Sequence, residues 1–223
     1  MKNNELISLA NQLSKYAVGG EGNVSARLTN ELFVIKASGT SLSSLSEKDL
    51  VTCNNQAIKT DNTNNKPSIE AGFHAWFFAT TTCKFVAHVH PTQTLKILCS
   101  EQHTNLFATK RLFPDQVVFN DLVSCIVPYK HPGLELCNEI KHCVNSYLEK
   151  HSHLPKLILL RNHGVITTGT TVKDCVTAID ICEKAAEIYL GAHGLGHISF
   201  ISDADSVKVV DDQNEVYRKT LIQ

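Results

Sequence analysis

The chain has 223 residues, of which 43% are hydrophobic and 19% are charged, and these values are typical of a globular protein. Its 21 basic and 22 acidic residues give a formal net charge of −1, so charge predicts neither a nucleic-acid partner nor a membrane-surface partner. No segment approaches the roughly 18 apolar residues of a membrane span. A signal peptide needs a continuous apolar core, and polar residues interrupt the apolar positions near the amino terminus. We therefore expect a soluble, cytoplasmic protein that folds as a single domain over residues 1–223.

Eight cysteines are scattered along the chain without a Cys-x-x-Cys pair. In a chain that shows no secretory signal, this pattern indicates reduced thiols, most of them buried. The spacings also argue against a cysteine zinc ribbon.

The first predicted element is an amphipathic helix over residues 4–18, which ends at Gly19, Gly20 and Gly22. A strand is expected over residues 23–27, directly after a tight backbone turn. Such a turn can present N–H groups to an anion, although an ordinary structural turn explains the same residues.

A second small-residue loop follows the strand that is predicted at residues 32–35. Its sequence, Ala37-Ser38-Gly39-Thr40, gathers backbone and hydroxyl donors and is a second candidate for anion binding. Residues 43–49 resemble the start of a helical turn, and residues 53–66 are expected to form a hairpin or an exposed loop.

A helix is predicted over residues 68–80, because Pro67 and Ser68 favour a helix start. Glu70 in the first turn is favoured by the helix dipole, so an N-terminal cap is the simplest interpretation of this acidic residue. Glu70 and His74 are four residues apart and should share one face of the helix. A short turn joins the helix to the next strand, which makes the two elements neighbours in space.

That strand, over residues 84–89, delivers the two histidines His88 and His90 and is stopped by Pro91. Residues at i and i+2 of an extended strand point to the same face, about 6.5–7 Å apart. Two imidazoles could therefore converge on one metal ion at the strand end. Zinc requires at least one more protein ligand, so a third ligand must come from elsewhere in the chain.

The rest of the chain alternates helices and apolar strands. We predict helices over residues 92–100, 134–149 and 171–190, strands over 126–129, 157–160 and 165–169, and a mixture of short strands and loops over 101–125 around Pro114. A capping-box pattern starts the last of these helices at Thr171, and three glycines after residue 190 are expected to end it. Residues 202–223 are polar and are expected to form a final helix or an ordered tail.

His163 is the best candidate for the third metal ligand. It follows the buried strand 157–160 and precedes a glycine, a position from which a strand end can reach a site in a packed core. Three neutral imidazoles with an open coordination position are the pattern of a catalytic zinc site. A set of hydrogen-bonded core histidines is the alternative interpretation. Other histidines are weaker candidates: His151 and His153 lie in a polar loop, His131 is expected at the surface, and a glycine-containing segment separates His193 from His197 and cannot hold them on one helix face.

Five short motifs, in this order and spacing, resemble the class II aldolase/adducin family over about residues 5–192. The motifs are Gly22-Asn23-Val24-Ser25, Ala37-Ser38-Gly39-Thr40, Pro67-Ser68-Ile69-Glu70 with His74, His88-Val89-His90, and Asn162-His163-Gly164. The resemblance implies that His88, His90 and His163 bind zinc or another divalent metal, and that Glu70 is the general acid/base. It also implies a substrate phosphate site formed by Asn23, Ser38, Gly39 and Ser68.

The resemblance implies a fold as well: an α/β subunit, α+β-like and three-layered, in which helices flank a central, mainly antiparallel sheet. It further implies a homotetramer with active sites at subunit interfaces, where Tyr217 near the carboxyl terminus could reach the site. One residue departs from the family pattern, because Ile69 stands where sugar-phosphate aldolases usually have a second serine. The loss of this hydroxyl predicts weaker phosphate binding or a different natural substrate.

The activity that the resemblance implies is that of a zinc-dependent aldolase, a lyase that reversibly cleaves a ketose 1-phosphate to dihydroxyacetone phosphate and an aldehyde. Zinc would stabilise the enediolate that develops as the carbon–carbon bond breaks, and Glu70 would carry the proton. A related sugar-phosphate dehydratase or epimerase would use the same histidines, although Glu70 in place of aspartate disfavours the epimerase. A non-catalytic, adducin-like scaffold is the third alternative, and the retained metal ligands weigh against it.

Overall fold

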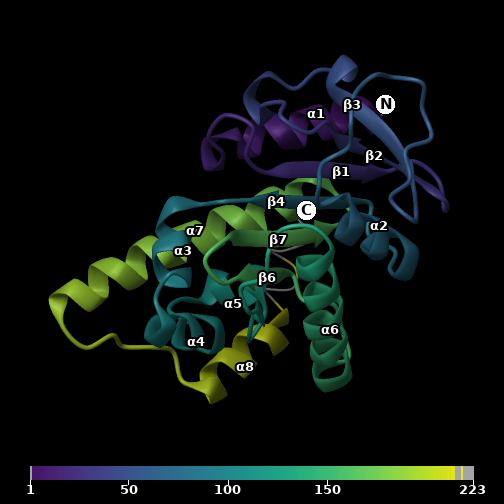
Figure 1. The fold of residues 1–223 in the computed structure, drawn as a ribbon. Coiled ribbons are helices and arrows are strands. Elements are labelled where there is room, and N and C mark those ends of the chain that lie inside the picture. Colours follow the sequence, from purple (N-terminus) through teal and green to yellow (C-terminus); the bar gives the residue numbers. More distant parts are fainter. Residues whose placement is uncertain (1, 214–216, 218–223) are drawn as a thin grey trace.

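A seven-stranded sheet forms the centre of the structure (Figure 1), a computed structural model that describes residues 2–213 and 217. Its strands are β1 (Asn23–Arg27), β2 (Leu32–Lys36), β3 (Leu50–Asn54), β4 (Phe85–Val89), β5 (Cys125–Val127), β6 (Leu157–Leu160) and β7 (Gly164–Gly169). They lie in the order β3-β2-β1-β4-β7-β6-β5, and each neighbouring pair is antiparallel except β5 with β6. The strand that carries the paired histidines, β4, is therefore the middle strand.

Helices cover both faces of this sheet, which gives three layers (Figure 1). They are α1 (Lys2–Leu13), α2 (Ala71–Thr80), α3 (Thr92–Leu98), α4 (Glu101–Thr109), α5 (Pro114–Asn120), α6 (Leu134–His151), α7 (Val172–Leu195) and α8 (Asp203–Asp211), with short 3₁₀ turns at Ser14–Tyr16, Leu42–Ser44 and Glu47–Asp49. Buried side chains of α1, α3, α4 and α7 pack in one hydrophobic core, and those of α2 and α6 pack in the other.

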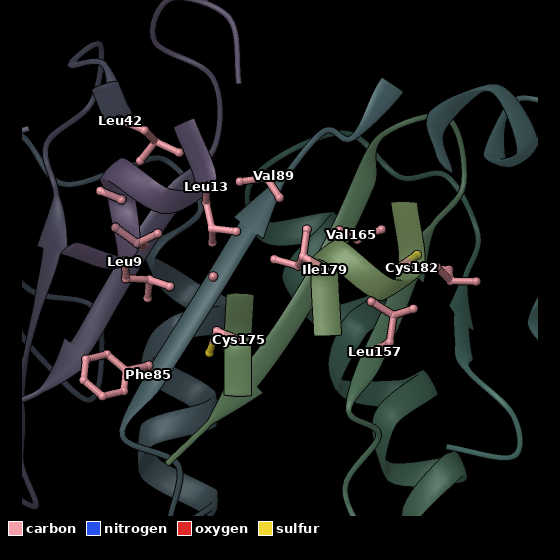
Figure 2. Close-up of a cluster of buried hydrophobic side chains, with 14 of the residues drawn as sticks. Leu9, Leu13, Leu42, Phe85, Val89, Leu157, Val165, Cys175, Ile179 and Cys182 are labelled. Atoms are coloured by element: carbon pink, nitrogen blue, oxygen red, sulfur yellow. The ribbon is translucent and has the colours of Figure 1, made fainter. Parts of the chain in front are cut away.

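The middle strand contributes to both cores because its side chains alternate between the two faces. Phe85, Ala87 and Val89 enter the core beneath α1 and α7, and Figure 2 shows Phe85 and Val89 there. Val86 enters the core beneath α2 and α6. His88 shares this second face, where the ring of Phe73 from α2 meets it edge-on at 6.1 Å. Packing on both faces thus directs His88 away from the first core.

The predicted fold, a mainly antiparallel sheet flanked by helices, is confirmed. The prediction of short strands and loops over residues 101–125 was wrong for most of that segment, which forms α4 and α5 before β5. Pro114 is the first residue of α5, where a proline fits because that N–H has no partner within the helix. α7 continues to Leu195 and stops before Gly196, whose φ is 138°. None of the helices in the described part of the chain is long and apolar enough to cross a membrane.

Gly164, the first residue of β7, allows the sheet to close around the end of β4. A β-carbon at this position would lie 2.5 Å from the carbonyl oxygen of Val89 and 2.6 Å from Cδ2 of His90. Both distances are shorter than van der Waals contact. A larger residue would therefore push β7 away from the strand end that carries the histidines.

We predict that Gly164→Ala lowers the free energy of unfolding by about 1–3 kcal/mol, because the added methyl group overpacks the contact between β4 and β7. Gly191→Ala is the matched control: Gly191 lies within α7 with open space around it, so alanine should stabilise the helix by about 0.5–1 kcal/mol. Chemical denaturation followed by circular dichroism measures both effects. A Gly164→Ala protein as stable as the wild type would contradict the predicted clash.

Candidate metal centre

His88 and His90 reach the same side of the sheet, as the strand periodicity predicts. His88 is fully buried, and its backbone lies between Asn23 on β1 and Ile166 on β7. His90 follows the last residue of β4, and its N–H donates to the carbonyl of Tyr16 at 3.0 Å. The centroids of the two imidazole rings are 4.9 Å apart.

His163 joins them from the loop between β6 and β7. Asn162 before it has a φ of 55°, a left-handed conformation that asparagine adopts more readily than most residues. Because β7 pairs with β4, this loop lies beside the end of the middle strand. The ring centroid of His163 is 4.8 Å from that of His88 and 5.2 Å from that of His90.

The three histidines offer ligand nitrogens that all lie within 4.8 Å of one another. Among the residues that the structure describes, no other group of three His, Cys, Asp or Glu side chains converges in this way. The sequence-based hypothesis selected the same three of the eleven histidines, and their juxtaposition is what it required.

A hydrogen bond sets the protonation of the His88 ring. Nδ1 of His88 lies 2.9 Å from the carbonyl oxygen of Val165 and must donate to it, which leaves Nε2 without a proton in the neutral ring. Nε2 of His90 faces this nitrogen at 3.1 Å, and the Glu21 carboxylate lies 3.4 Å from Nδ1 of His90. A carboxylate or carbonyl on the far nitrogen is the usual support of a metal-binding histidine.

Burial disfavours the protonated form of two of the rings, His88 and His163. Desolvation, reinforced by the neighbouring His90, lowers the pKa of His88 to about 3. Desolvation and the neighbouring His88 lower the pKa of His163 to about 4. Both rings are therefore neutral at pH 7, which is the form that binds a metal ion.

The carboxylate of Glu70 faces the histidine cluster from the N-terminus of α2. Its Oε2 lies 3.4 Å from Nε2 of His88 and accepts a hydrogen bond of 2.8 Å from the side-chain amide of Asn23. Its Oε1 lies 3.5 Å from Nε2 of His163 and has no hydrogen-bond partner among the described residues, although it is buried. Glu70 occupies the N-cap position of α2, but its side chain makes no cap hydrogen bond, so capping does not account for the carboxylate.

These residues fit a divalent cation. Three imidazole nitrogens that leave a fourth position open match a catalytic zinc site, and the carboxylate of Glu70 lies beside it. Oε1 of Glu70 is buried without a hydrogen-bond partner among the described residues and faces Nε2 of His163 at 3.5 Å, so a cation between them would satisfy both atoms. The site therefore has the ligand atoms for a metal ion and a buried carboxylate oxygen that a cation would stabilise.

A cavity of about 230 Å³ adjoins this cluster, and the residues predicted to bind phosphate lie in its wall. It is lined by Asn23, Ser38, Gly39, Ser68, Ile69, Glu70, His90 and His163, among others. A backbone bridge between Ala37 and Pro67 holds the two serine-containing loops together. Ile69 is 71% exposed and leaves its position without a hydroxyl.

Lys36 also lines this cavity, and the sequence-based reasoning missed it. It is only 2% exposed, and its ammonium group donates to the carbonyl oxygens of Gly20, Ala37 and Thr40 at 3.2, 3.4 and 2.6 Å. Burial lowers its pKa. The available signal was a single charge at the end of the apolar run 32–35.

Tyr217 is 64% exposed in this chain. The described residues that line the cavity do not include it. Its role, and the homotetramer in which it would act, stay predictions.

The profile of the class II aldolase and adducin N-terminal domain matches residues 5–190. The chain belongs to this family. Among its curated relatives, the 3-oxo-tetronate 4-phosphate decarboxylase of Haemophilus influenzae is 28% identical over 191 residues, which cover 85% of this chain and 86% of the relative. The L-fuculose phosphate aldolase of Methanococcus maripaludis is 25% identical over 178 residues, which cover 78% of this chain and 87% of the relative.

Solved structures show that the fold of this family member is shared. A Klebsiella pneumoniae protein described as an aldolase, epimerase or decarboxylase superposes with a TM-score of 0.76 at 24% identity, over 92% of this chain and 95% of the other. An L-fuculose 1-phosphate aldolase superposes with a TM-score of 0.77 at 19% identity, over 94% of each chain. At these identities the likeness establishes the fold and leaves the reaction to be argued from the site.

We predict that the wild-type protein holds about one zinc ion per chain and that His88→Ala lowers its zinc content at least tenfold, because a ligand is lost. His153→Ala is the matched control, since its side chain is half exposed outside the cluster and should leave the zinc content unchanged. Mass spectrometry of the metal after dialysis measures both variants. Equal zinc in His88→Ala and the wild type would contradict the proposed centre.

Proposed function

We propose that this protein is a zinc-dependent lyase that reversibly cleaves a ketose 1-phosphate to dihydroxyacetone phosphate and an aldehyde. The observation that carries the proposal is the Glu70 carboxylate, which lies within 3.5 Å of two of the three clustered histidines. The adjoining cavity adds donors suited to a phosphate. The family includes proteins named as aldolases of phosphorylated sugars, which supports the same reaction class.

Glu70 is the residue that we assign to proton transfer. In the cleavage direction it takes the proton of the substrate hydroxyl whose carbon becomes the aldehyde. The carbon–carbon bond then breaks, its electron pair stays on the carbon next to the ketone, and Glu70 returns the proton to that carbon. A divalent metal bound by His88, His90 and His163 supplies Lewis-acid polarisation of the ketone.

The phosphate would be anchored at the other end of the cavity. Ser38, Ser68 and the backbone of Gly39 offer neutral donors, and Asn23 has a second amide N–H beyond the one that it gives to Glu70. Lys36 supplies the positive charge, since only carbonyl oxygens, with partial charges, hold its ammonium group. This charge compensates for the hydroxyl that is missing at Ile69.

Decarboxylation is the second candidate, and the Haemophilus influenzae relative favours it. In a 3-oxo-tetronate 4-phosphate, loss of the carboxyl group as carbon dioxide leaves its electron pair on the carbon next to the ketone. Protonation of this carbon then yields dihydroxyacetone phosphate. Both reactions therefore form the same three-carbon enediolate, and they differ in the group that leaves.

We predict that the zinc-loaded protein releases dihydroxyacetone phosphate from at least one ketose 1-phosphate and that Glu70→Gln lowers kcat by at least about 100-fold, because proton transfer is lost. An enzyme-coupled assay for dihydroxyacetone phosphate measures the rate, and metal analysis checks that Glu70→Gln keeps its zinc. Activity of Glu70→Gln equal to that of the wild type would refute the assignment.

The second product, released besides dihydroxyacetone phosphate, distinguishes the two candidate reactions in the same assays. Release of an aldehyde supports the aldolase, whereas carbon dioxide from 3-oxo-tetronate 4-phosphate, with no ketose 1-phosphate cleaved, supports the decarboxylase.

Lys36→Met should raise KM for the phosphorylated substrate more than it lowers kcat. Lys66→Met, an exposed lysine close to the same loop, is its control.

A further inference from the structure

Four buried polar side chains form a row behind the metal centre, where β1 packs beneath α2. Ser25 and Asn23 come from β1, and His74 and Glu70 come from α2 and its N-cap. Their exposed fractions are 0%, 2%, 0% and 7%. A row of polar groups this deeply buried is expensive unless each group has a partner.

The spacing of the two elements explains why the four side chains meet. Asn23 and Ser25 are two residues apart in a strand, about 6.5–7 Å along one face. Glu70 and His74 are four residues apart at the start of a helix, about one turn and about 6 Å along one side. The strand repeat and the helix repeat therefore match, and Asn23 sits between the carboxylate and the imidazole.

The hydrogen bonds of the row run in one direction. The amide nitrogen of Asn23 donates to Glu70 at 2.8 Å, since a carboxylate can only accept there. The carbonyl oxygen of Asn23 must then accept, so its partner Nε2 of His74 carries the proton. Nδ1 of His74 is left without a proton and accepts from the hydroxyl of Ser25 at 2.6 Å.

His74 cannot serve the metal directly, because both of its ring nitrogens have protein partners in this row. Its ring stacks on Phe73 with centroids 4.4 Å apart. Its effect on the site passes through the amide of Asn23. If that amide were reversed, its oxygen would face the carboxylate oxygen of Glu70, and its N–H group would meet the Nε2 proton of His74 unless the ring changed tautomer.

We propose that His74 is a positioning residue: it fixes the amide of Asn23 so that Asn23 anchors one oxygen of Glu70 and leaves the other free toward the histidine cluster. The inference rests on the proposed role of Glu70 in proton transfer. It also assigns Asn23 a first task at the carboxylate, beside the phosphate contact predicted from the family.

Two substitutions of His74 separate the donor from the bulk of the ring. In His74→Gln the side-chain nitrogen replaces Nε2 and can still donate to Asn23, whereas in His74→Asn the shorter amide reaches only the position of Nδ1. We expect kcat to fall about 10–100-fold in His74→Asn, with KM changed less than about threefold, and to recover largely in His74→Gln. Thr167→Val, which removes another buried side-chain hydrogen bond in the sheet, should keep wild-type kcat.

Nitrogen-15 NMR of the metal-free protein provides a readout that needs no turnover. The signal that disappears in both His74 variants should show a neutral ring with its proton on Nε2, and the side-chain amide signals of Asn23 should shift in His74→Asn. A proton on Nδ1, unmoved Asn23 signals, or wild-type kcat in His74→Asn would overturn the proposal. Failure of every ketose phosphate to react, with the NMR signature present, would count against the proposed function alone.

Discussion

The antiparallel pairing of β4 with β1 and β7 is the constraint on which the whole site depends. This register places His88 beside Asn23 on one neighbour and within hydrogen-bond distance of the Val165 carbonyl on the other. A shift by one residue would turn His88 toward the core beneath α1 and α7 and turn Phe85 and Val89 toward α2 and α6. Hydrophobic burial on one face of the strand therefore secures the histidine on the other. Hydrophobic residues that take no part in the reaction therefore fix the position of the histidine ligand.

The same burial makes the negative charge of Glu70 costly unless a cation lies near it. The carboxylate of Glu70 lies among neutral imidazoles whose pKa values are lowered by desolvation, and one of its oxygens has no hydrogen-bond partner among the described residues. Such a buried charge is costly without a counterion. A divalent cation would offset this cost, and its binding free energy would then contribute to the stability of the fold.

Much of this arrangement could be predicted from the sequence where the signal was local. The two-residue spacing of His88 and His90 and the strand end before His163 were enough to select three histidines. Lys36 and Ser25 were missed because their importance depends on what lies across the sheet, which spacing within one strand does not reveal. The helices within residues 101–125 were missed because their mixed composition gave no clear period, and Pro114 suggested a loop although it starts α5. The sequence does not predict which group leaves in the reaction, because the two candidate reactions would form the same enediolate.

If three imidazole nitrogens hold a metal ion next to Glu70, none of the eight cysteines of the chain should contribute a sulfur ligand. X-ray absorption spectroscopy at the zinc edge of the purified, zinc-loaded protein tests this most directly. A zinc ion bound by three imidazoles should show nitrogen and oxygen scatterers at about 2.0–2.1 Å with the multiple-scattering pattern of imidazole. A sulfur shell at about 2.3 Å, or a zinc ion without imidazole scattering, would contradict it.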